Sequence, residues 1–525
     1  MKLLSDPKYV ALTKATWSIF DEYQHEVASS HWRPRYHISP VAGLLNDPNG
    51  FCFFNNEYHL FYQWYPFGIA HGMKHWAHVK SDDLVNWSSP TLAMTPDTAY
   101  DARGVYSGAA YCVTQENGEQ ECLLYFTGNL KYENDIRDAT QCVATLSKDG
   151  VVTKSDKNPL IPAVPAGYSG HVRDPKVFAV GNEYRMLLGA QTEQEKGCVL
   201  VYRSDDAMAW ELMGELDVRF TNDDDIIGGY MWECPDFFEL DGRDVLVFSP
   251  QGVAPQGERF RNEFNVVYCL GRADWRTLTF DVEVMQELDR GFDFYAAQTM
   301  DNHPFGERIL SAWAGCGDPD YPSDREGWSN CLTFPRALTI QDNQLCQRPV
   351  DAIQALYAEH QQGEGMGSGM KALAADILNR YRFTLTLDGV QRLTTLSLLA
   401  TAHESLDLII DADENRITLD RSGMSSRFAK QWGEQRSVFY PVGETLEIDV
   451  LIDGSIAEIF IDGGRLAFTA RVFPQSPRSQ IELHSTSNIH YRFNAFEISP
   501  SVNTAPITAE ALVQLDLHTE PTRES

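Results

Sequence analysis

Short apolar runs broken by turn residues dominate the chain between residues 36 and 349. Such runs lie at 51–64, 121–129, 184–191, 197–204, 244–251 and 307–315. Paired asparagines and Asn-Gly, Asp-Gly and Gly-Glu steps separate them, and these residues favour turns. Two or more strands fit into every unit of about sixty residues, which is enough for a four-stranded sheet.

Two other patterns flank this region. Residues 7–30 carry apolar positions at helical spacing, which predicts a short helix packed outside the first repeat. Residues 350–373 run from a short helical stretch into glycines, which predicts a linker. Alternating strands with Asp-Gly hairpin turns at 453–454 and 462–463 follow, and they favour a β-sandwich. The expected units are an N-terminal extension (1–32), a strand-rich domain (33–349), a linker (350–373), a sandwich (374–500) and a polar tail (501–525).

The strand-rich domain repeats with a period of about sixty residues. Its repeats open on a polar residue beside a Pro, Gly or aromatic residue, namely Asp47, Ser107, Asp174, Glu233 and Asp293, at intervals of 60, 67, 59 and 60 residues. Such a period is typical of a β-propeller, in which every blade sends its first strand to one axis. The sequence therefore predicts an all-β fold, a five-bladed β-propeller followed by a C-terminal β-sandwich, with a short N-terminal helix.

Three of the five residues that open the repeats are carboxylates, and they occupy the same place in their repeats. Asp47 and Asp174 each have a purely structural interpretation as an alternative. Asp47-Pro48-Asn49-Gly50 is a turn sequence, and Asp174 could form an ion pair with Arg173. Their common phase favours one shared site. Retaining glycosidases need an ionised carboxylate and a protonated carboxyl close together. Glu233, beside Trp232 at an apolar strand start, suits the acid, Asp47 suits the ionised partner, and Asp174 is expected to stay charged and hold sugar hydroxyls.

Eight motifs, in this order, resemble glycoside hydrolase family 32, the β-fructofuranosidases or invertases, and within it the bacterial intracellular sucrose and sucrose-6-phosphate hydrolases. They are HISPVAGLLNDPNG, QWYP, HWAHVKSDDLVNW, YSG, RDPKVF, WECPDFF, DFYAAQ and REGWSNCLTFPRAL. The resemblance covers residues 33–349 strongly and the later strands weakly. It implies the same fold, a propeller followed by a sandwich.

The resemblance also implies roles for individual residues. Asp47 matches the family's nucleophile, Glu233 its acid and base, and Asp174 its transition-state stabiliser. The residues that match the lining of the fructose pocket are Leu44, Leu45, Asn46, Gln63, Tyr106, Ser107, Arg173, Tyr295 and Trp313. The implied activity is retaining cleavage of terminal non-reducing β-D-fructofuranosides, sucrose first, through a covalent fructosyl-enzyme on Asp47.

The chain departs from the family pattern at the rim of this pocket. Leu44-Leu45 stands where Trp-Met is usual, and His71 stands where another Trp is usual. Aromatic faces stack on sugar rings, so we expect weaker contact with the leaving sugar.

Composition and charge exclude several classes of function. The chain has 525 residues and a net charge of −31, which disfavours binding to nucleic acid or anionic membranes. No apolar stretch is long enough for a membrane span, and the N-terminal residues lack the apolar core of a secretory signal. Ten scattered cysteines without zinc spacing indicate reduced thiols in a cytoplasmic protein. His75, His78 and the acidic run 223–225 lack a full ligand pattern, so we expect no metal and no cofactor.

Other functions remain as alternatives. A non-catalytic sugar-binding propeller would lack Asp47 or Glu233, and both are present. The ordered motifs disfavour an arabinanase-like glycosidase. A fructosyltransferase would share all three carboxylates. The choice among sucrose, sucrose 6-phosphate and short fructans stays open, as does the oligomeric state.

Overall fold

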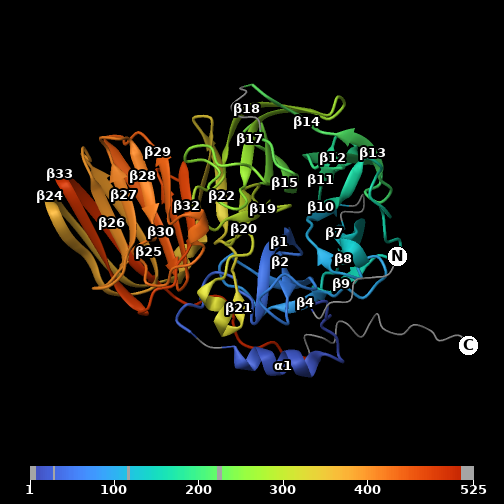
Figure 1. The fold of residues 1–525 in the computed structure, drawn as a ribbon, viewed down its shortest axis with the longest axis horizontal. Coiled ribbons are helices and arrows are strands. Elements are labelled where there is room, and N and C mark those ends of the chain that lie inside the picture. Colours follow the sequence, from blue (N-terminus) through green and yellow to red (C-terminus); the bar gives the residue numbers. More distant parts are fainter. Residues whose placement is uncertain (1–7, 28–29, 115–118, 222–226, 510–525) are drawn as a thin grey trace, which may run out of the picture.

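Five β-sheets stand around a common centre, and a β-sandwich lies against one side of this ring (Figure 1). The computed structural model describes residues 8–27, 30–114, 119–221 and 227–509. Within these residues there is one α-helix, α1 (Trp17–Glu26), which lies beside the first blade. The predicted five-bladed propeller, C-terminal sandwich and short N-terminal helix are confirmed.

Each blade is a mostly antiparallel sheet whose first strand lies nearest the axis. Blade 1 contains β1 (Gly43–Phe54), β2 (Glu57–Tyr65), β3 (His75–Ser81) and β4 (Thr91–Met94). Blade 2 contains β5 (Val105–Tyr106), β6 (Ala110–Thr114), β7 (Gln120–Lys131), β8 (Arg137–Leu146) and β9 (Val152–Lys154). Blade 3 contains β10 (Tyr168–Val180), β11 (Glu183–Thr192), β12 (Gly197–Ser204) and β13 (Glu211–Glu215).

The last two blades complete the ring. Blade 4 contains β15 (Met231–Leu240), β16 (Arg243–Gln251), β17 (Val267–Asp274) and β18 (Thr279–Glu287), with β14 (Asp217–Phe220) parallel to β18. Blade 5 contains β19 (Tyr295–Thr299), β20 (Arg308–Trp313), β22 (Arg336–Gln341) and β23 (Gln344–Pro349). Between β20 and β22, β21 (Trp328–Ser329) leaves blade 5 and pairs in parallel with β1. This pairing joins the last blade to the first.

A register shift interrupts the first strand of four blades. The shifts fall between Leu45 and Pro48, Arg173 and Lys176, Glu233 and Asp236, and Tyr295 and Gln298. A β-bulge of this kind re-aims the side chains that it contains. Glu233, Asp174 and Asp47 are respectively the first, second and third residue of their bulges. The predicted common position is therefore not exact, but each carboxylate lies in the bulge of the first strand of its own blade.

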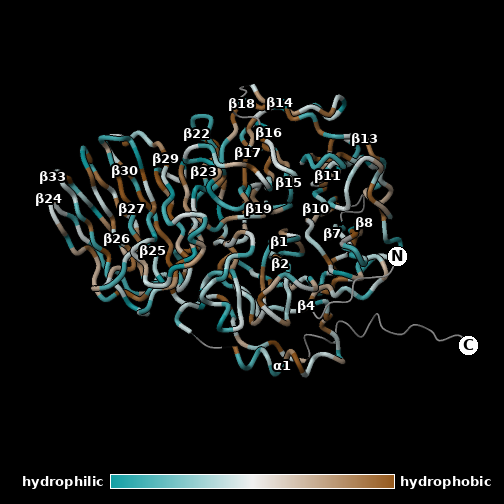
Figure 2. Tube along the Cα trace, viewed as in Figure 1, coloured by the Kyte–Doolittle hydropathy of each residue, from teal (hydrophilic) through white to brown (hydrophobic). Residues whose placement is uncertain are grey.

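The sandwich is built on two long paired strands, β24 (Tyr357–Leu378) and β33 (Arg478–Ile498). One half of β33 continues into β25 (Arg380–Asp388), β30 (Thr445–Asp453), β31 (Ile456–Ile461) and β32 (Leu466–Arg471). The other half continues into β26 (Thr394–Ala400), β27 (Leu406–Asp411), β28 (Arg416–Asp420) and β29 (Gln435–Phe439). Every second side chain of β25 and β27 is buried, and Figure 2 shows apolar and polar residues alternating along the sandwich strands.

The predicted linker is a strand. Residues 351–356 form a 3-10 turn, and the glycine-rich stretch lies within β24. Gly363 and Gly365 lie opposite Phe493 and Tyr491 of β33, and an added Cβ at Gly365 would stand 2.5 Å from the Tyr491 hydroxyl. These glycines therefore make room for aromatic rings across the strand pair and do not mark a flexible segment. The other 3-10 helices within the described ranges are η1 (Glu133–Asp135), η3 (Pro322–Glu326) and η5 (Lys430–Trp432).

Helix α1 and the last described residues pack together. Gln24 exchanges two hydrogen bonds with the backbone of Ile507, at 2.9 and 3.0 Å, and Phe20 meets Trp64 of blade 1 edge-on. Residues 501–509 are therefore held on blade 1, and the rest of the predicted polar tail lies outside the described residues. No helix among the described residues is both long enough and apolar enough to cross a membrane.

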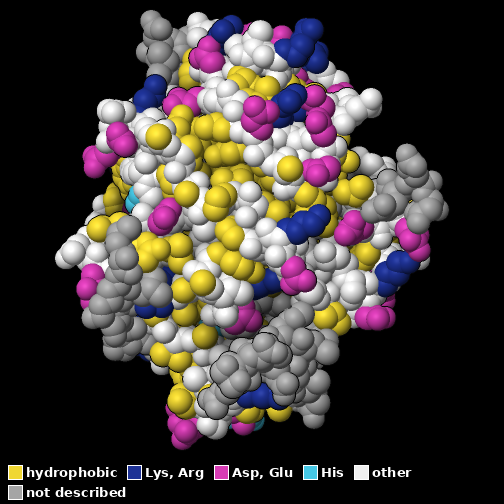
Figure 3. Space-filling model, turned by 90° about the vertical axis from the view of Figure 1, so that its right-hand side faces the viewer, with side chains coloured by type: hydrophobic (Ala, Val, Ile, Leu, Met, Phe, Trp, Pro, Cys, Tyr) yellow, Lys and Arg dark blue, Asp and Glu magenta, His cyan; other side chains and the backbone are white. Residues whose placement is uncertain are grey.

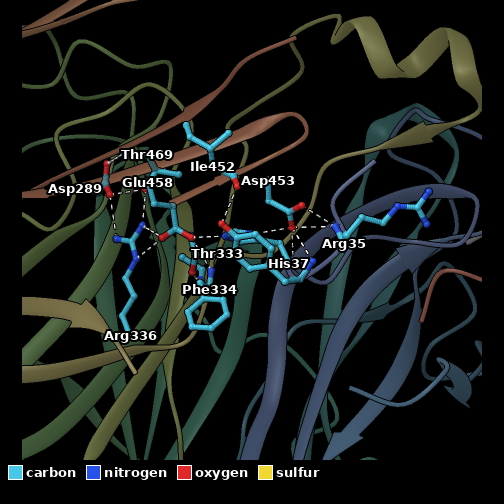
Figure 4. Close-up of polar contacts among 12 residues, drawn as sticks. Arg35, His37, Asp289, Thr333, Phe334, Arg336, Ile452, Asp453, Glu458 and Thr469 are labelled. Atoms are coloured by element: carbon cyan, nitrogen blue, oxygen red, sulfur yellow. Dashed lines mark hydrogen bonds and ion pairs between the residues drawn. The ribbon is translucent and has the colours of Figure 1, made fainter. Parts of the chain in front are cut away.

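A buried polar network joins the propeller to the sandwich (Figure 4). The ring nitrogens of His37 contact Asp453 at 3.0 Å and Glu458 at 2.8 Å. Arg336 of blade 5 contacts Glu458 and, at 3.1 Å, Asp289. Asp293, predicted to open the fifth repeat, belongs to a neighbouring part of this interface, because it accepts hydrogen bonds from Tyr321 and Arg421.

Candidate active site

The Asp47 carboxylate lies in the bulge of β1 and receives a hydrogen bond on each oxygen. Ser107 donates to Oδ2 over 2.5 Å, and the Asn46 amide donates to Oδ1 over 3.0 Å. Asn46 also donates to Gln63 at 2.6 Å and accepts from the ammonium of Lys74 at 2.6 Å. Because the carbonyl oxygen of Asn46 is bound to Lys74, its amide nitrogen is directed toward Asp47.

Glu233 extends from the bulge of β15 into a ring of donors. Arg173 donates through Nε to Oε1 at 2.8 Å, and a second guanidinium nitrogen contacts the same oxygen. Tyr295 and Gln251 donate to Oε2 at 2.6 and 2.8 Å. Tyr295 also lies 3.3 Å from the carbonyl oxygen of Ser249, which is a second acceptor for its hydroxyl.

Asp174 interacts electrostatically with both other carboxylates and has a backbone φ of +66°, in the left-handed region. Its Oδ2 accepts the backbone N–H of Cys234 at 3.0 Å, and its own N–H donates to Thr127 at 3.1 Å. The Cys234 sulfur lies 3.6 Å from Asp174 Oδ2 and 4.0 Å from Asp47 Oδ2. The three carboxylates thus meet around the start of β15.

Burial dominates the electrostatics of the site. It raises the pKa of Asp47 above its ordinary value, against the Ser107 hydrogen bond and with a contribution from the charge of Glu233. Burial and the charges of Glu233 and Asp47 raise the pKa of Asp174 to about 7, although Arg173 opposes this. Burial lowers the pKa of Lys74 to about 7, against the attraction of Asp47.

These groups line a pocket of about 310 Å³ that opens at the axis of the propeller. Of the predicted residues, the pocket lining includes Asn46, Asp47, Gln63, Tyr106, Arg173, Asp174, Glu233, Tyr295 and Trp313. Asn46, Gln63 and Asp174 are almost fully buried, whereas Lys8, Tyr9, Lys131 and Arg137 are half-buried and Asp318 is exposed. Ser107 reaches the site through its hydrogen bond to Asp47.

Two predicted pocket residues do not line this pocket. Leu44 is 3% exposed and packs with Tyr65 and Met73, and Leu45 is 0% exposed in the core of blade 1. Both residues precede the point where the bulge of β1 turns side chains toward the axis, which explains their burial.

Two expectations about neighbours also need correction. Trp232 does not cover Glu233, because adjacent residues of a strand face opposite sides; its ring stacks on Phe248 at 4.4 Å. The partner of Arg173 is Glu233 and not Asp174. Asp174 therefore lacks the direct ion pair on which its expected permanent charge depended.

Several residues of the site escaped the sequence analysis. Lys74 donates a hydrogen bond to Asn46, and Gln251 donates one to Glu233. The pocket lining also contains Lys8, Tyr9, Lys131 and Arg137. Lys74 stands directly before the apolar strand β3, and lysines are rarely buried without a partner. This position could have indicated Lys74 from the sequence. Lys8 and Tyr9 carried no signal, because only the fold brings their segment to the pocket.

The described residues contain one group of three side chains close enough to share a metal ion, Cys52, Cys112 and Cys122. Cys112 and Cys122 face each other across β6 and β7, and the sulfurs of Cys52 and Cys122 are 3.7 Å apart. These thiols pack among apolar side chains between blades 1 and 2 and do not belong to the carboxylate pocket. The acidic run at 223–225 lies outside the described residues.

Comparison with known families gives two matches that together span most of the chain. The N-terminal domain of glycosyl hydrolases family 32 matches residues 37–349. The C-terminal domain of the same family matches residues 355–500. The boundary between the matches falls in the 3-10 turn that joins the propeller to the sandwich.

Individual proteins agree with these matches. The chain is 36% identical over 485 residues to the sucrose-6-phosphate hydrolase of Staphylococcus xylosus, covering 91% of this chain and 95% of the relative. Among solved structures, the sucrose-6-phosphate hydrolase of Lactobacillus gasseri is 33% identical with a TM-score of 0.84, covering 94% and 99% of the two chains. A variant of the Bombyx mori family 32 β-fructofuranosidase, solved in complex with sucrose, is 28% identical with a TM-score of 0.78 over 94% and 99%.

Proposed function

The chain belongs to glycosyl hydrolases family 32 and is a glycosidase that hydrolyses fructosides; from this premise we propose that it cleaves terminal non-reducing β-D-fructofuranosides, with sucrose as its principal substrate. The mechanism is retaining, with Asp47 as nucleophile and Glu233 as acid and base. The observation that supports this most directly is the convergence of Asp47, Asp174 and Glu233 in one pocket.

Asp47 suits attack on the anomeric carbon of fructose. Its carboxylate is held by Ser107 and Asn46, so that its orientation does not depend on the substrate. Preorganised hydrogen bonds of this kind lower the cost of reaching the transition state. Attack forms a bond between an Asp47 oxygen and the anomeric carbon, and the bond to the leaving oxygen breaks.

Glu233 suits the transfer of a proton to that leaving oxygen. When Oε2 carries the proton, the Tyr295 hydroxyl can donate to the Ser249 carbonyl oxygen instead. When the proton has left, Tyr295, Gln251 and Arg173 all donate to the carboxylate. The same group then removes a proton from the water that hydrolyses the fructosyl-enzyme, since the second step reverses the first.

Asp174 suits the binding of fructose hydroxyls. Its pKa of about 7 means that it can accept a hydrogen bond when ionised and donate one when protonated. A contact of this kind accelerates the reaction when it strengthens in the transition state. An Asp174→Asn variant is therefore expected to lose mainly kcat.

A second candidate substrate is sucrose with a phosphate on its glucose unit. Three half-buried cationic side chains, Lys8, Lys131 and Arg137, line the pocket, and we place the leaving sugar beside them. Phosphate pairs well with lysine and arginine. An assay of glucose, glucose 6-phosphate and fructose released from the two substrates separates the candidates.

Two variants test the catalytic assignment. Asp47→Asn and Glu233→Gln should each lower kcat by about a thousandfold or more, because each removes a group that takes part in bond breaking. Asp217→Asn, which changes an exposed carboxylate on β14, is the control. Retention of more than a tenth of wild-type activity in either active-site variant would contradict the assignment.

Trapping experiments add a direct readout. With an activated fructoside, Glu233→Gln should accumulate a hexosyl adduct on the peptide that contains Asp47, visible by mass spectrometry.

We also propose a cytoplasmic location, which is supported by the absence of disulfides among the ten cysteines, all of which lie in the described residues.

A further inference from the structure

The segment before helix α1 runs along the edge of the active-site pocket. Residues 8–14 were predicted to be helical, but the helix begins only at Trp17. Lys8 and Tyr9 line the pocket together with His71, Lys74 and the three carboxylates. They are the only described residues from outside the five blades and their connections that do so.

Hydrogen bonds fix this segment on both sides of Tyr9. The carbonyl oxygen of Lys8 accepts the N–H of Met73 at 3.0 Å. The N–H of Leu12 donates to His75 at 2.9 Å, and its carbonyl oxygen accepts from Thr95 at 3.2 Å. Leu12 is fully buried in the core of blade 1. The segment is thus an integral part of the pocket wall.

The surrounding sequence is adapted to the segment. A Cβ added at Gly72 would lie 2.7 Å from the Lys8 carbonyl oxygen and 2.6 Å from the Tyr65 ring. Only glycine therefore lets the segment approach the connection between β2 and β3 this closely. Tyr9 packs against the cluster of Leu44, Tyr65 and Met73, and the Arg103 guanidinium lies 5.4 Å from its ring centre.

Tyr9 lies near the two positions, Leu44 and His71, at which the sequence departs from the family pattern by lacking an aromatic residue. Leu44 packs under Tyr9, and His71 lines the same pocket. With the fructose unit next to Asp47, the leaving group lies against the rest of the pocket lining, which includes Lys8 and Tyr9. We propose that Lys8 and Tyr9 form part of the subsite for the leaving sugar, so that the N-terminal segment sets leaving-group specificity.

This inference rests on the proposed function, and a pair of substrates separates the two. Sucrose and methyl β-D-fructofuranoside share the fructose unit, but only sucrose has a leaving group large enough to reach Tyr9. Tyr9→Ala should lower kcat/KM for sucrose about tenfold, the scale of one aromatic contact, and change kcat/KM for the methyl fructoside less than twofold. Tyr9→Phe, which keeps the ring, should retain most of the activity on sucrose.

Further variants guard against a trivial loss of structure. Lys8→Met should lower kcat/KM for sucrose severalfold with the same selectivity, and Phe439→Ala, an exposed aromatic on the sandwich, is the matched control. An equal fall with both substrates, or no change with sucrose in Tyr9→Ala and Lys8→Met, would overturn the inference. Failure of the wild-type protein to release fructose from either substrate would instead refute the proposed function.

Discussion

At the scale of single residues, the proposed nucleophile, Asp47, is surrounded by groups with separate tasks. Ser107 binds one oxygen of Asp47, Asn46 binds the other, and Lys74 holds Asn46 in the orientation that makes this possible. Substitution of Ser107, Asn46 or Lys74 should therefore change the pKa or the orientation of the Asp47 carboxylate.

Removal of the Ser107 hydroxyl should shift the pH dependence of the reaction. The hydrogen bond from Ser107 stabilises ionised Asp47 and lowers its pKa, so Ser107→Ala should raise that pKa. The acidic limb of the kcat/KM profile should then move to higher pH by about one unit, the worth of one hydrogen bond to a charged group. An unshifted limb together with a lower plateau would show that Ser107 acts on the substrate alone.

Chelation should leave the reaction rate unchanged, because the mechanism that we propose uses only side chains. The measurement is kcat on sucrose before and after dialysis against a chelator, followed by addition of zinc or calcium. A loss that metal restores would contradict this expectation. The thiols of Cys52, Cys112 and Cys122 would then be the first residues to substitute.

The sequence located the three carboxylates but not their surroundings. Their common period brought Asp47, Asp174 and Glu233 to one axis, and the structure places them in one pocket. The burial of Leu44 and Leu45, the pairing of Arg173 with Glu233 and the approach of Tyr9 depend on bulges and on distant packing. A linear pattern with a period of two residues cannot register a bulge of one extra residue.

At the scale of elements, β24 shows how composition can mislead. Four glycines between residues 363 and 369 resemble a flexible linker, yet they belong to the longest strand of the described chain. The reason lies on β33, where Phe493 and Tyr491 occupy the space that side chains at Gly363 and Gly365 would need. Such a pairing can be predicted only when the partner strand is known.

Filling one of these spaces should destabilise the sandwich without affecting the active site. Gly365→Val would place its Cβ 2.5 Å from the Tyr491 hydroxyl, and overpacking of this kind costs about 1–3 kcal/mol. Chemical unfolding should show the loss, while kcat/KM for the folded enzyme stays at the wild-type value. Gly443→Val is the matched control, because its nearest neighbour would lie at 3.4 Å. Equal stability of the two variants would contradict this account of β24.

At the scale of the whole molecule, the propeller and the sandwich share buried charges. Arg336 from blade 5 lies between Asp289 of the propeller and Glu458 of the sandwich, and all three side chains are inaccessible to solvent. Elsewhere charges of both signs are interspersed, as on the face in Figure 3, where they surround a broad apolar area. The interface is therefore where substitution of a charge should matter most.

Removing one partner of the buried network should weaken both domains together. Arg336→Met leaves Glu458 and Asp289 buried without their shared cation, which typically costs about 3–5 kcal/mol. Calorimetry should show one unfolding transition at a lower temperature. A sandwich that unfolds at its wild-type temperature while the propeller unfolds earlier would contradict the coupling.

The same network predicts how stability depends on pH. Burial lowers the pKa of His37, but the hydrogen bonds to Asp453 and Glu458 outweigh this effect and leave the pKa raised. The contribution of His37 to folding stability is therefore complete below pH 6.5 and is lost as pH rises through the pKa of the folded state. Burial raises the pKa of Glu458, but Arg336 and His37 outweigh this effect and leave the pKa lowered. The contribution of Glu458 to folding stability is therefore lost as pH falls through the pKa of the folded state. The stability difference between wild type and His37→Asn should therefore be larger at pH 6 than at pH 9 in denaturant titrations, and an equal difference would refute it.

The contact between His37 and the sandwich also bears on synthesis by the ribosome. His37 lies ten residues before Asp47, whereas its partner Asp453 is 416 residues further along the chain. At about 5–20 residues per second, roughly 20–80 s separate the emergence of the two. Throughout that interval His37, in the segment that leads into β1, lacks its buried partners. The segment that leads into blade 1 consequently stays without these contacts until almost the whole chain has emerged.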